Sequence, residues 1–235
     1  GDYKKVRFTF QEYFRRMSSD PTRWSQPFAA LLGAYNAQMG FGLPSIGGKD
    51  SMSGTFDDEH GEINVPPTLV SFAVDVNSCK NIITPEFKKA GSKIVEFKIN
   101  RDNYDLPDYA QIMDGYGKLF EDIKAGKILS AYAVEGRGAA EAVSKMAFGN
   151  KMGVKIEHNV DPRDFFGAGW GNIVCEVAEG KVGELSIPYT VLGEVTDKAV
   201  FEYGNTTITM EEALASWTKT LEDVFPTVTG KEKTG

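Results

Sequence analysis

The sequence has few of the residues on which disulfide frameworks, metal sites and nucleophilic catalysis depend. It contains two cysteines and two histidines among 235 residues. Cys79 and Cys175 lie 96 positions apart and form no C-x-x-C motif, so we expect reduced thiols, buried as small apolar side chains in a cytoplasmic protein. His60 and His158 fall in two expected turns. No Ser-His-Asp or Cys-His catalytic arrangement can therefore be assembled.

An excess of positive charge and a long apolar run are also missing. The 26 Lys and Arg residues are outnumbered by 33 Asp and Glu residues, for a formal net charge of −7. This balance argues against a general nucleic-acid binder and against an anionic membrane surface. No run approaches the roughly 18 apolar residues of a membrane span, and we expect no signal peptide. With 41% hydrophobic and 25% charged residues, the composition is that of a globular protein with one large or two small domains.

What the sequence does contain is a polar, glycine-rich stretch at residues 44–54. Its central residues are Ile46, Gly47, Gly48, Lys49, Asp50, Ser51, Met52 and Ser53. Adjacent glycines permit positive φ and close approach to a ligand, and the ammonium, carboxylate and hydroxyl groups are suited to a phosphate and its metal ion. The spacing is not that of a Walker A loop. Because the same residues also form ordinary turns, the residue types alone leave a phosphate-binding loop and a structural turn both open.

The stretch from Ile46 to Ser53 closely resembles the Gly-Lys-Asp-Ser-Met-Ser signature of phosphoribosylformylglycinamidine synthase, the amidotransferase of purine biosynthesis. The surroundings are similar too, with an expected helix before it and an apolar strand beginning at Pro66 after it. Residues 139–150 resemble a helix of the family's C-terminal subdomain. The resemblance extends over residues 6–225, and the chain looks like a fragment of the family's second aminoimidazole-ribonucleotide-synthetase-like half.

The resemblance implies a site for ATP or ADP with Mg²⁺. The expected phosphate-binding residues of the stretch are Gly47, Gly48, Lys49, Ser51 and Ser53, and the expected metal ligand is Asp50. A glycine-rich strand-to-helix turn at residues 135–138 presents backbone N–H groups to an anion and adds Gly136 and Gly138. The family usually has a metal-binding aspartate where Gly136 stands and a glycine where Arg137 stands. This departure argues against a metal ion at the turn.

The resemblance also implies a reaction and partners. Enzymes of this family use ATP to activate the formyl-amide oxygen of formylglycinamide ribonucleotide, and ammonia released from glutamine displaces phosphate to give the amidine, with glutamate and ADP as the other products. The chain lacks the glutaminase nucleophile and the upstream synthetase half, so we expect it to be inactive alone and to have the remaining domains, including the glutaminase domain, as partners. Two alternatives stay open: a different ATP-using relative, such as aminoimidazole ribonucleotide synthetase or selenophosphate synthetase, and a non-enzymatic structural half.

Hydrophobic periodicity predicts an α/β (α+β) chain of two subdomains, the first incomplete. We expect a first subdomain at residues 1–83, a second at 84–228 and a flexible tail at 229–235. In the first, apolar residues at i, i+3, i+4 and i+7 predict a helix over residues 8–17. Trp24 is expected as a packed anchor. The remaining expectations here are a helix over 28–39, an acidic and solvated hairpin tip over 57–62, and a buried strand over 68–76.

The second subdomain is expected to alternate strands and helices. The expected strands cover residues 93–99, 128–134, 154–157, 172–177 and 190–195, with a hairpin of 199–203 and 206–209 about Gly204-Asn205. The expected helices cover residues 109–125, 139–148 and 211–224. The last of these helices is expected to bury Ala213, Leu214, Trp217, Leu221 and Val224. His158 is expected to face solvent.

Overall fold

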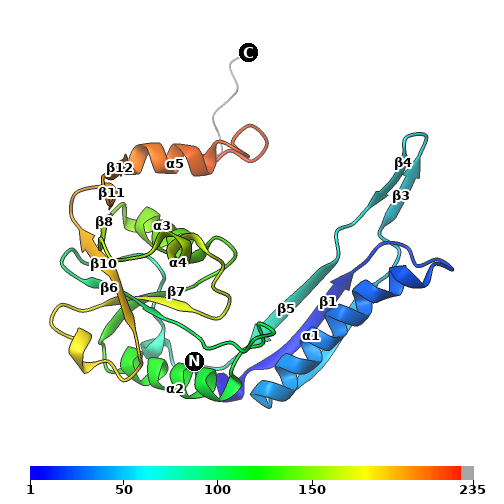
Figure 1. Cartoon of the computed structure of the whole chain (residues 1–235), viewed down its shortest axis with the longest axis horizontal. Coiled ribbons are helices and arrows are strands. Elements are labelled where there is room, and N and C mark those ends of the chain that lie inside the picture. The colour runs from blue at the N-terminus through cyan, green and yellow to red at the C-terminus, as the bar shows by residue number, and fades with distance from the viewer. Residues whose placement is uncertain (229–235) are drawn as a thin grey trace. The chain divides into compact units, whose positions relative to one another are not determined.

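The structure, a computed structural model, describes residues 1–228. It divides into two compact units, Gly1–Ile82 and Ile83–Gly235 (Figure 1). The flexible tail expected at 229–235 lies outside the described residues. Within the described part of the chain, no helix is long and apolar enough to cross a lipid bilayer.

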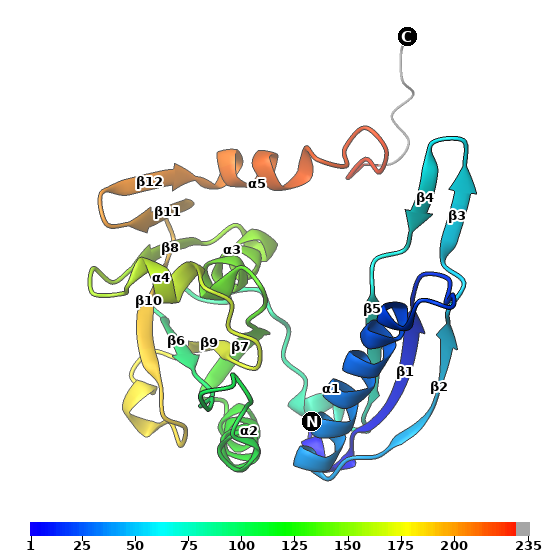
Figure 2. The same ribbon diagram turned by 45° about the vertical axis from the view of Figure 1, so that its right-hand side comes forward.

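The first unit is a three-stranded sheet with one long helix lying along it (Figure 2). The central strand β1 (Arg7–Tyr13) pairs in parallel with β2 (Ser45–Ser51) and antiparallel with β5 (Thr68–Val74). Helix α1 (Ser25–Phe41) connects β1 to β2, and confirms the helix expected over 28–39. Short 3-10 turns lie at Tyr3–Lys5, Pro21–Trp24 and Cys79–Asn81.

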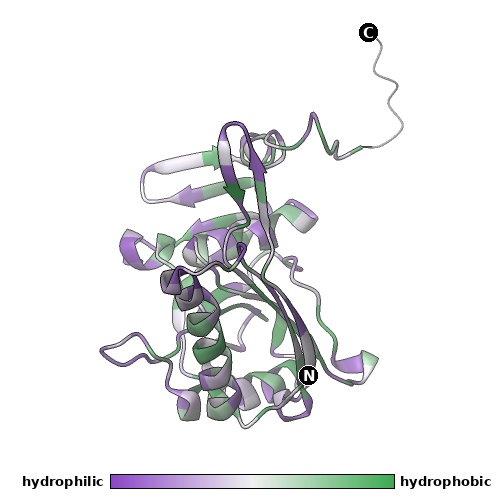
Figure 3. Ribbon diagram, turned by 90° about the vertical axis from the view of Figure 1, so that its right-hand side faces the viewer, coloured by the Kyte–Doolittle hydropathy of each residue, from purple (hydrophilic) through white to green (hydrophobic). Residues whose placement is uncertain are grey.

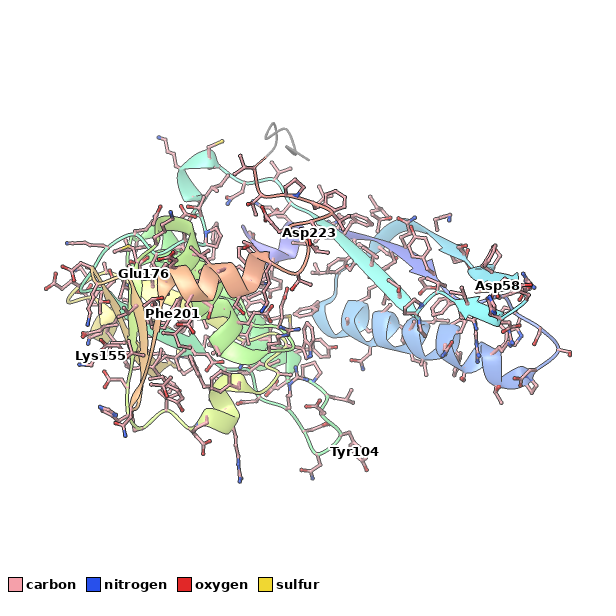
Figure 4. All side chains as sticks on the ribbon, turned by 90° about the horizontal axis from the view of Figure 1, so that it is seen from above. Asp58, Tyr104, Lys155, Glu176, Phe201 and Asp223 are labelled. Carbon is pink, nitrogen blue, oxygen red and sulfur yellow. The ribbon has the colours of Figure 1, made fainter. Side chains whose placement is uncertain are left out.

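Strands β3 (Thr55–Asp58) and β4 (Gly61–Asn64) form a separate hairpin in this unit, as the acidic segment 57–62 predicted. Its tip is hydrophilic in Figure 3 and carries Asp58, labelled in Figure 4. Among the described residues, no group of three or more His, Cys, Asp and Glu side chains is placed to hold a metal ion. Residues 57–62 are all exposed, so the hairpin tip is a solvated acidic turn.

Two predictions for the first unit are wrong in secondary structure. Residues 8–17 do not form a helix, because β1 takes residues 7–13 and pairs on both sides. The rings of Phe8 and Phe10 lie 5.8 Å apart on one face, as the two-residue repeat of a strand requires. The glycine-rich stretch is not a loop, since Ser45–Ser51 is strand β2. Pairing with neighbouring strands overrode the local turn preference of Gly-Gly-Lys-Asp-Ser.

Several apolar side chains of the first unit are exposed where burial was expected. Trp24 is 52% exposed, so it is not a packed anchor in this structure, and most of β5 is exposed as well. Helix α1 packs with its small residues inward, since Ala30, Ala34 and Ala37 are half-buried, whereas its large apolar residues point outward. The exposed large residues of α1 are Phe28, Leu31, Leu32, Tyr35 and Met39. Figure 3 shows the apolar residues along the ribbon of α1 in green.

The second unit is built on a seven-stranded sheet in the order β12-β11-β8-β10-β6-β9-β7. Its strands are β6 (Lys93–Phe97), β7 (Ile128–Ala133), β8 (Gly153–Ile156), β9 (Ile173–Val177), β10 (Thr190–Thr196), β11 (Val200–Tyr203) and β12 (Thr206–Thr209). Its helices are α2 (Tyr109–Lys124), α3 (Gly138–Asn150), α4 (Pro162–Phe166) and α5 (Met210–Thr218), with a 3-10 turn at Val182–Glu184. These elements confirm the strands and the first two helices that the periodicity predicted.

Each face of this sheet has its own apolar core. Along β6, Ile94 belongs to the cluster under α3 and α4, whereas Val95 and Phe97 belong to the cluster under α2. Figure 1 shows α2 on one side of the sheet and α3 with α4 on the other. The alternation of side chains along buried strands thus produces a helix–sheet–helix arrangement.

The end of the second unit departs from the prediction. Helix α5 ends at Thr218, six residues before the predicted end at residue 224. The side chains of Trp217, Leu221 and Val224 are exposed rather than buried. A short helix depends on tertiary packing for its stability. Trp217 stacks on Phe148 at 5.1 Å, whereas Leu221 and Val224 are 61% and 72% exposed. The prediction that both thiols are buried is half wrong: Cys79 is exposed, whereas burial in the sheet raises the pKa of the Cys175 thiol to about 12.

One buried acid, Glu176 on β9, ties the start of the second unit to the sheet (Figure 4). Its carboxylate accepts hydrogen bonds from the backbone N–H groups of Lys88 (2.8 Å) and Lys89 (2.9 Å) and from the Ser130 hydroxyl (2.8 Å). A buried carboxylate is stable only where donors of this kind replace water. Glu176 is accordingly a structural acid that fixes the segment preceding β6.

We predict that Glu176→Ala lowers the free energy of unfolding by about 2–4 kcal/mol, because it leaves three donors without an acceptor in a dry environment. Urea denaturation followed by circular dichroism measures the change. Glu179→Ala, an exposed acid just beyond the same strand, is the control and should stay within about 0.5 kcal/mol of the wild type. Equal stability of the two variants would contradict the role given to Glu176.

Candidate functional site

The residues of the glycine-rich stretch are divided between the two faces of β2. The β1–β2 register pairs Thr9 with Gly47, Gln11 with Lys49 and Tyr13 with Ser51. Because side chains alternate along a strand, Gly47, Lys49 and Ser51 share one face, and Gly48 and Asp50 share the other. The Thr9 hydroxyl donates a hydrogen bond of 3.0 Å to the Gly47 carbonyl. We call the face with Lys49 the open face, since α1 lies against the opposite one.

On the open face, Lys49 is an exposed cation held over an aromatic ring. Its Nζ lies 5.5 Å from the centroid of the Tyr13 ring. In the part of the chain that the structure describes, no carboxylate lies within ion-pair distance of Lys49. Lys49 and Asp50, although adjacent in sequence, form no ion pair with each other. A lysine oriented by a ring face and free of a carboxylate partner is available to an anion.

On the helix side, Asp50 lies beside a second acid that the sequence interpretation missed. Glu12 of β1 is its register partner, and burial together with the Asp50 carboxylate raises the pKa of Glu12. Both acids line a cavity of about 600 Å³ whose walls are mostly apolar side chains of α1 and its approach. The cavity residues are Glu12, Pro21, Trp24, Ser25, Pro27, Phe28, Leu31, Asp50 and Met52. Two neighbouring carboxylates repel each other, and a cation between them would relieve that repulsion.

The two glycines of the stretch have different environments. A Cβ on Gly48 would lie 2.6 Å from the Phe10 carbonyl oxygen, so this glycine is required by strand pairing. A Cβ on Gly47 would have no heavy atom within 4 Å, so its absence of a side chain leaves the open face bare. Ser53 follows the strand and is exposed. The open face thus combines Gly47, Lys49 and Ser51 on a strand that is at the edge of its described sheet.

The second expected set, Gly136 and Gly138, lies in the second unit at the start of α3. Gly138 has φ of +74°, and a Cβ there would lie 2.5 Å from the carbonyl oxygens of Phe165 and Gly167. Its N–H donates to the Glu135 carbonyl at 3.2 Å and is not free for an anion. A Cβ on Gly136 would lie 3.3 Å from the Trp170 ring, a close but tolerable contact. Packing against residues 165–170 accounts for Gly138 without any ligand.

A polar network lies next to this turn, where the Asn172 carbonyl accepts a hydrogen bond from the Val134 N–H at 2.9 Å. Asn172 donates from Nδ2 to Glu96 Oε1 (2.8 Å), and its Oδ1 accepts from the Ile99 N–H (3.0 Å). Lys98 lies between two acids, 3.7 Å from Glu96 and 3.2 Å from Asp164. Burial raises the pKa of Glu96, although the Asn172 and Lys98 contacts oppose the shift. Glu96 and Asn172, the central residues of this network, were not singled out in the sequence.

We predict that Gly138→Ala destabilises the second unit by about 2–4 kcal/mol, because it adds backbone strain at positive φ to an overlap with two carbonyl oxygens. Thermal unfolding measures the loss. The matched control is Gly117→Ala in α2, where a Cβ would have no neighbour within 4 Å and alanine is the better helix former. The control should gain about 0.5–1 kcal/mol, and a neutral Gly138→Ala would contradict the packing argument.

We predict that Glu96→Gln becomes more favourable relative to the wild type as the pH rises from 4 to 7. The pKa of Glu96 is higher in the folded than in the unfolded chain, so folding takes up a proton and wild-type stability falls as the pH rises through the folded pKa. Glutamine keeps the oxygen that Asn172 donates to and does not ionise. Urea denaturation at several pH values measures the difference, and a stability difference that is the same at all pH values would refute the assignment.

No protein-family model matches the chain. Among solved structures, the chain is similar to phosphoribosylformylglycinamidine synthase II of Thermotoga maritima, with a TM-score of 0.63 and 14% sequence identity over 88% of this chain. It is similar to T. maritima PurL complexed with ATP at a TM-score of 0.62 and 13% identity, again over 88% of the chain. The chain spans 37% of the length of each of these two proteins.

The chain is also similar to Escherichia coli HypE, with a TM-score of 0.59 and 13% identity over 87% of this chain and 71% of that protein. At these identities the likeness concerns the fold. It confirms the fold class that the resemblance of residues 46–53 implied. The chain therefore has the α/β fold of aminoimidazole-ribonucleotide-synthetase type that is shared by PurL and HypE.

Proposed function

We propose that this chain is part of an ATP-dependent ligase of the phosphoribosylformylglycinamidine synthase type, in which the open face of β2 binds a phosphate of ATP or ADP. The observation that carries the proposal is Lys49, an exposed ammonium on Tyr13 without a carboxylate partner among the described residues. The fold shared with PurL, which was solved in complex with ATP, supports it. The resemblance of residues 46–53 to the family signature supports it independently.

In this proposal each residue of the stretch has a separate task. Lys49 supplies the positive charge, Ser51 a hydroxyl donor on the same face, and Gly47 the bare backbone that admits a phosphate. Tyr13 holds the lysine stem and ammonium in place, which reduces the entropy lost on binding. Gly48 keeps β2 against β1. Ser53 remains in the proposal as a further phosphate contact beside β2. Gly136 remains a separate backbone candidate in the second unit, whereas the N–H of Gly138 is already bonded to Glu135 and its missing side chain is explained by packing.

The proposal includes Mg²⁺, with Asp50 as its ligand. Mg²⁺ in proteins is commonly bound by one or two carboxylates together with substrate phosphates, and the register pair of Glu12 and Asp50 matches that donor set. When bound, the ion would neutralise phosphate charge. The two carboxylates face α1, whereas Lys49 lies on the opposite face of the sheet. The metal ion and the lysine would therefore contact different parts of a nucleotide that lies around the edge strand β2.

The wider activity is also a proposal. The complete reaction would convert formylglycinamide ribonucleotide, glutamine and ATP to the amidine, glutamate, ADP and phosphate. The remaining domains of the enzyme, including the glutaminase domain, would supply ammonia and the rest of the active site. This chain would contribute nucleotide binding or a scaffold, would be inactive by itself, and would act in the cytoplasm.

We predict that Lys49→Ala weakens binding of ADP with Mg²⁺ about ten- to hundredfold in the enzyme that contains this chain, because a charge-assisted contact worth roughly 1.5–3 kcal/mol is lost. Calorimetric titration measures the affinity. Lys80→Ala, an exposed lysine of the same unit, is the control and should leave the affinity unchanged. Lys49→Arg should retain most of the binding, since the charge is kept.

The same titration, carried out with and without Mg²⁺, tests Asp50 as the metal ligand. Asp50→Asn should weaken ADP binding in the presence of Mg²⁺ and leave it unchanged in the absence of the ion.

Equal affinity of the wild type and Lys49→Ala for ADP would remove Lys49 as a ligand. In that case the stretch would be a structural strand, and the non-enzymatic half would be the better description of the chain.

A further inference from the structure

The cavity of about 600 Å³ beside α1 and β2 has a lining that the nucleotide proposal mostly leaves unused. We call it the α1 cavity. Its nine lining residues are six apolar side chains, two acids and one serine. The serine is already used, because the Ser25 hydroxyl donates a hydrogen bond to the Thr22 carbonyl at 2.7 Å. The volume is in the range of small-molecule sites, roughly 300–1,000 Å³.

One wall of the cavity is an apolar stripe that the first unit leaves uncovered. Trp24, Phe28 and Leu31 follow one another at i, i+4 and i+7, so they lie on one face of the helical segment that continues into α1 (Figure 2). These residues are 52%, 60% and 59% exposed, respectively. Two aromatic rings and a leucine on one face offer contact area to an apolar or aromatic body.

The two carboxylates of the cavity lack hydrogen-bond donors. Glu12 and Asp50 are register partners on neighbouring parallel strands, so their side chains lie on the same face of the sheet. Within residues 1–228, neither side chain forms a hydrogen bond or an ion pair. Arg16 and Arg23 do not compensate them, because these arginines pair with acids of the β3–β4 hairpin at 2.7 Å and 3.0 Å.

The charge of the cavity is therefore negative. Its lining includes two acids and, among the described residues, no base. In the same part of the chain, Asp50 is the charged group that acts on Glu12, whereas Arg15 acts on Asp20. The positive end of α1, worth about half a charge, offsets only part of the charge of two carboxylates. A cation with hydrogen-bond donors would complement this pair.

We propose that the α1 cavity binds an organic ammonium ion that carries an apolar or aromatic body. The ammonium group would donate hydrogen bonds to Glu12 and Asp50, and the body would pack on Trp24, Phe28 and Leu31. A cation beside ring faces gains further stabilisation. The site shares Asp50 with the Mg²⁺ ion proposed above but does not use Lys49, so it does not depend on phosphate binding at β2.

2-Phenylethylammonium is the probe, because it joins one ammonium group to one ring. The protein has three tryptophans, and in the ¹⁵N-labelled chain each indole N–H gives its own NMR signal. Trp24→Phe assigns the signal of the cavity tryptophan by removing it. The expected result is a saturable shift of the Trp24 signal, while the signals of Trp170 and Trp217 in the second unit stay in place. Absence of a saturable Trp24 shift overturns the site.

Two matched compounds separate the charge from the apolar body. 2-Phenylethanol has a hydroxyl in place of the ammonium and should bind about three- to tenfold more weakly. Ethylammonium has the charge without the ring and should bind about tenfold or more weakly. Equal binding of the alcohol and the ammonium compound overturns the cationic assignment. Equal binding of the two ammonium compounds overturns the apolar part.

Variants test the two carboxylates. Glu12→Gln and Asp50→Asn should each weaken binding of 2-phenylethylammonium about two- to fivefold and leave that of 2-phenylethanol unchanged. Glu59→Gln is the control, since this acid of the hairpin tip has a side chain that is 87% exposed and lies outside the cavity. An unchanged affinity of the double variant Glu12→Gln/Asp50→Asn for the ammonium compound contradicts the proposal.

The apolar wall has a matched pair of leucines on α1. Leu31→Ala should weaken binding of both phenyl compounds about two- to tenfold, whereas Leu32→Ala, at an exposed leucine outside the cavity, should not change it. Equal effects of the two substitutions would overturn the placement of the ring. These titrations contain neither nucleotide nor Mg²⁺, so their outcome is separate from that of the ADP titration of Lys49→Ala.

Discussion

The parallel pairing of β1 with β2 is the constraint on which the interpretation of the first unit depends. It places Thr9 beside Gly47 and Glu12 beside Asp50, and a shift by one residue would exchange the two faces of the glycine-rich stretch. In this register, Lys49 and Asp50, which are adjacent in sequence, lie on opposite faces of the sheet. The same pairing explains Gly48, whose missing side chain lets the Phe10 carbonyl approach.

Much of the second unit could be predicted from periodicity, and the reason is burial. Strands β6 and β9 and helix α2 face apolar cores, so their sequences carry a clear repeat. The hydrophobic repeat of the first unit is less clear. Most side chains of its strands are not buried, and α1 is apolar on more than one side. Over residues 8–17, Phe10, Tyr13, Phe14 and Met17 match a helical repeat by coincidence. Only the pairing of residues 7–13 with β2 and β5 decides in favour of a strand.

The candidate site was predictable in its residue types and not in its geometry. Residue types identified Lys49 and Asp50, since a phosphate and a metal ion need such groups. Strand pairing determines the geometry. It separates Lys49 and Asp50 on opposite faces, places Asp50 beside Glu12, and sets Lys49 over the ring of Tyr13. Glu12 was overlooked because it lay in a segment assigned to a helix. Had the segment been taken as a strand, its two-residue alternation would have set Glu12 and Phe10 on a common face.

The close packing of Gly138 against the carbonyl oxygens of Phe165 and Gly167 has a consequence for how this chain can be compared across species. A glycine required by packing will persist in descendants that have lost every ligand, as long as they still fold. Lys49 is different, since it contacts only a ring face and its loss costs the fold little. In a lineage that abandoned nucleotide binding, Lys49 would drift while Gly138 stayed. Retention of the lysine, rather than retention of the glycine, would then record selection for function.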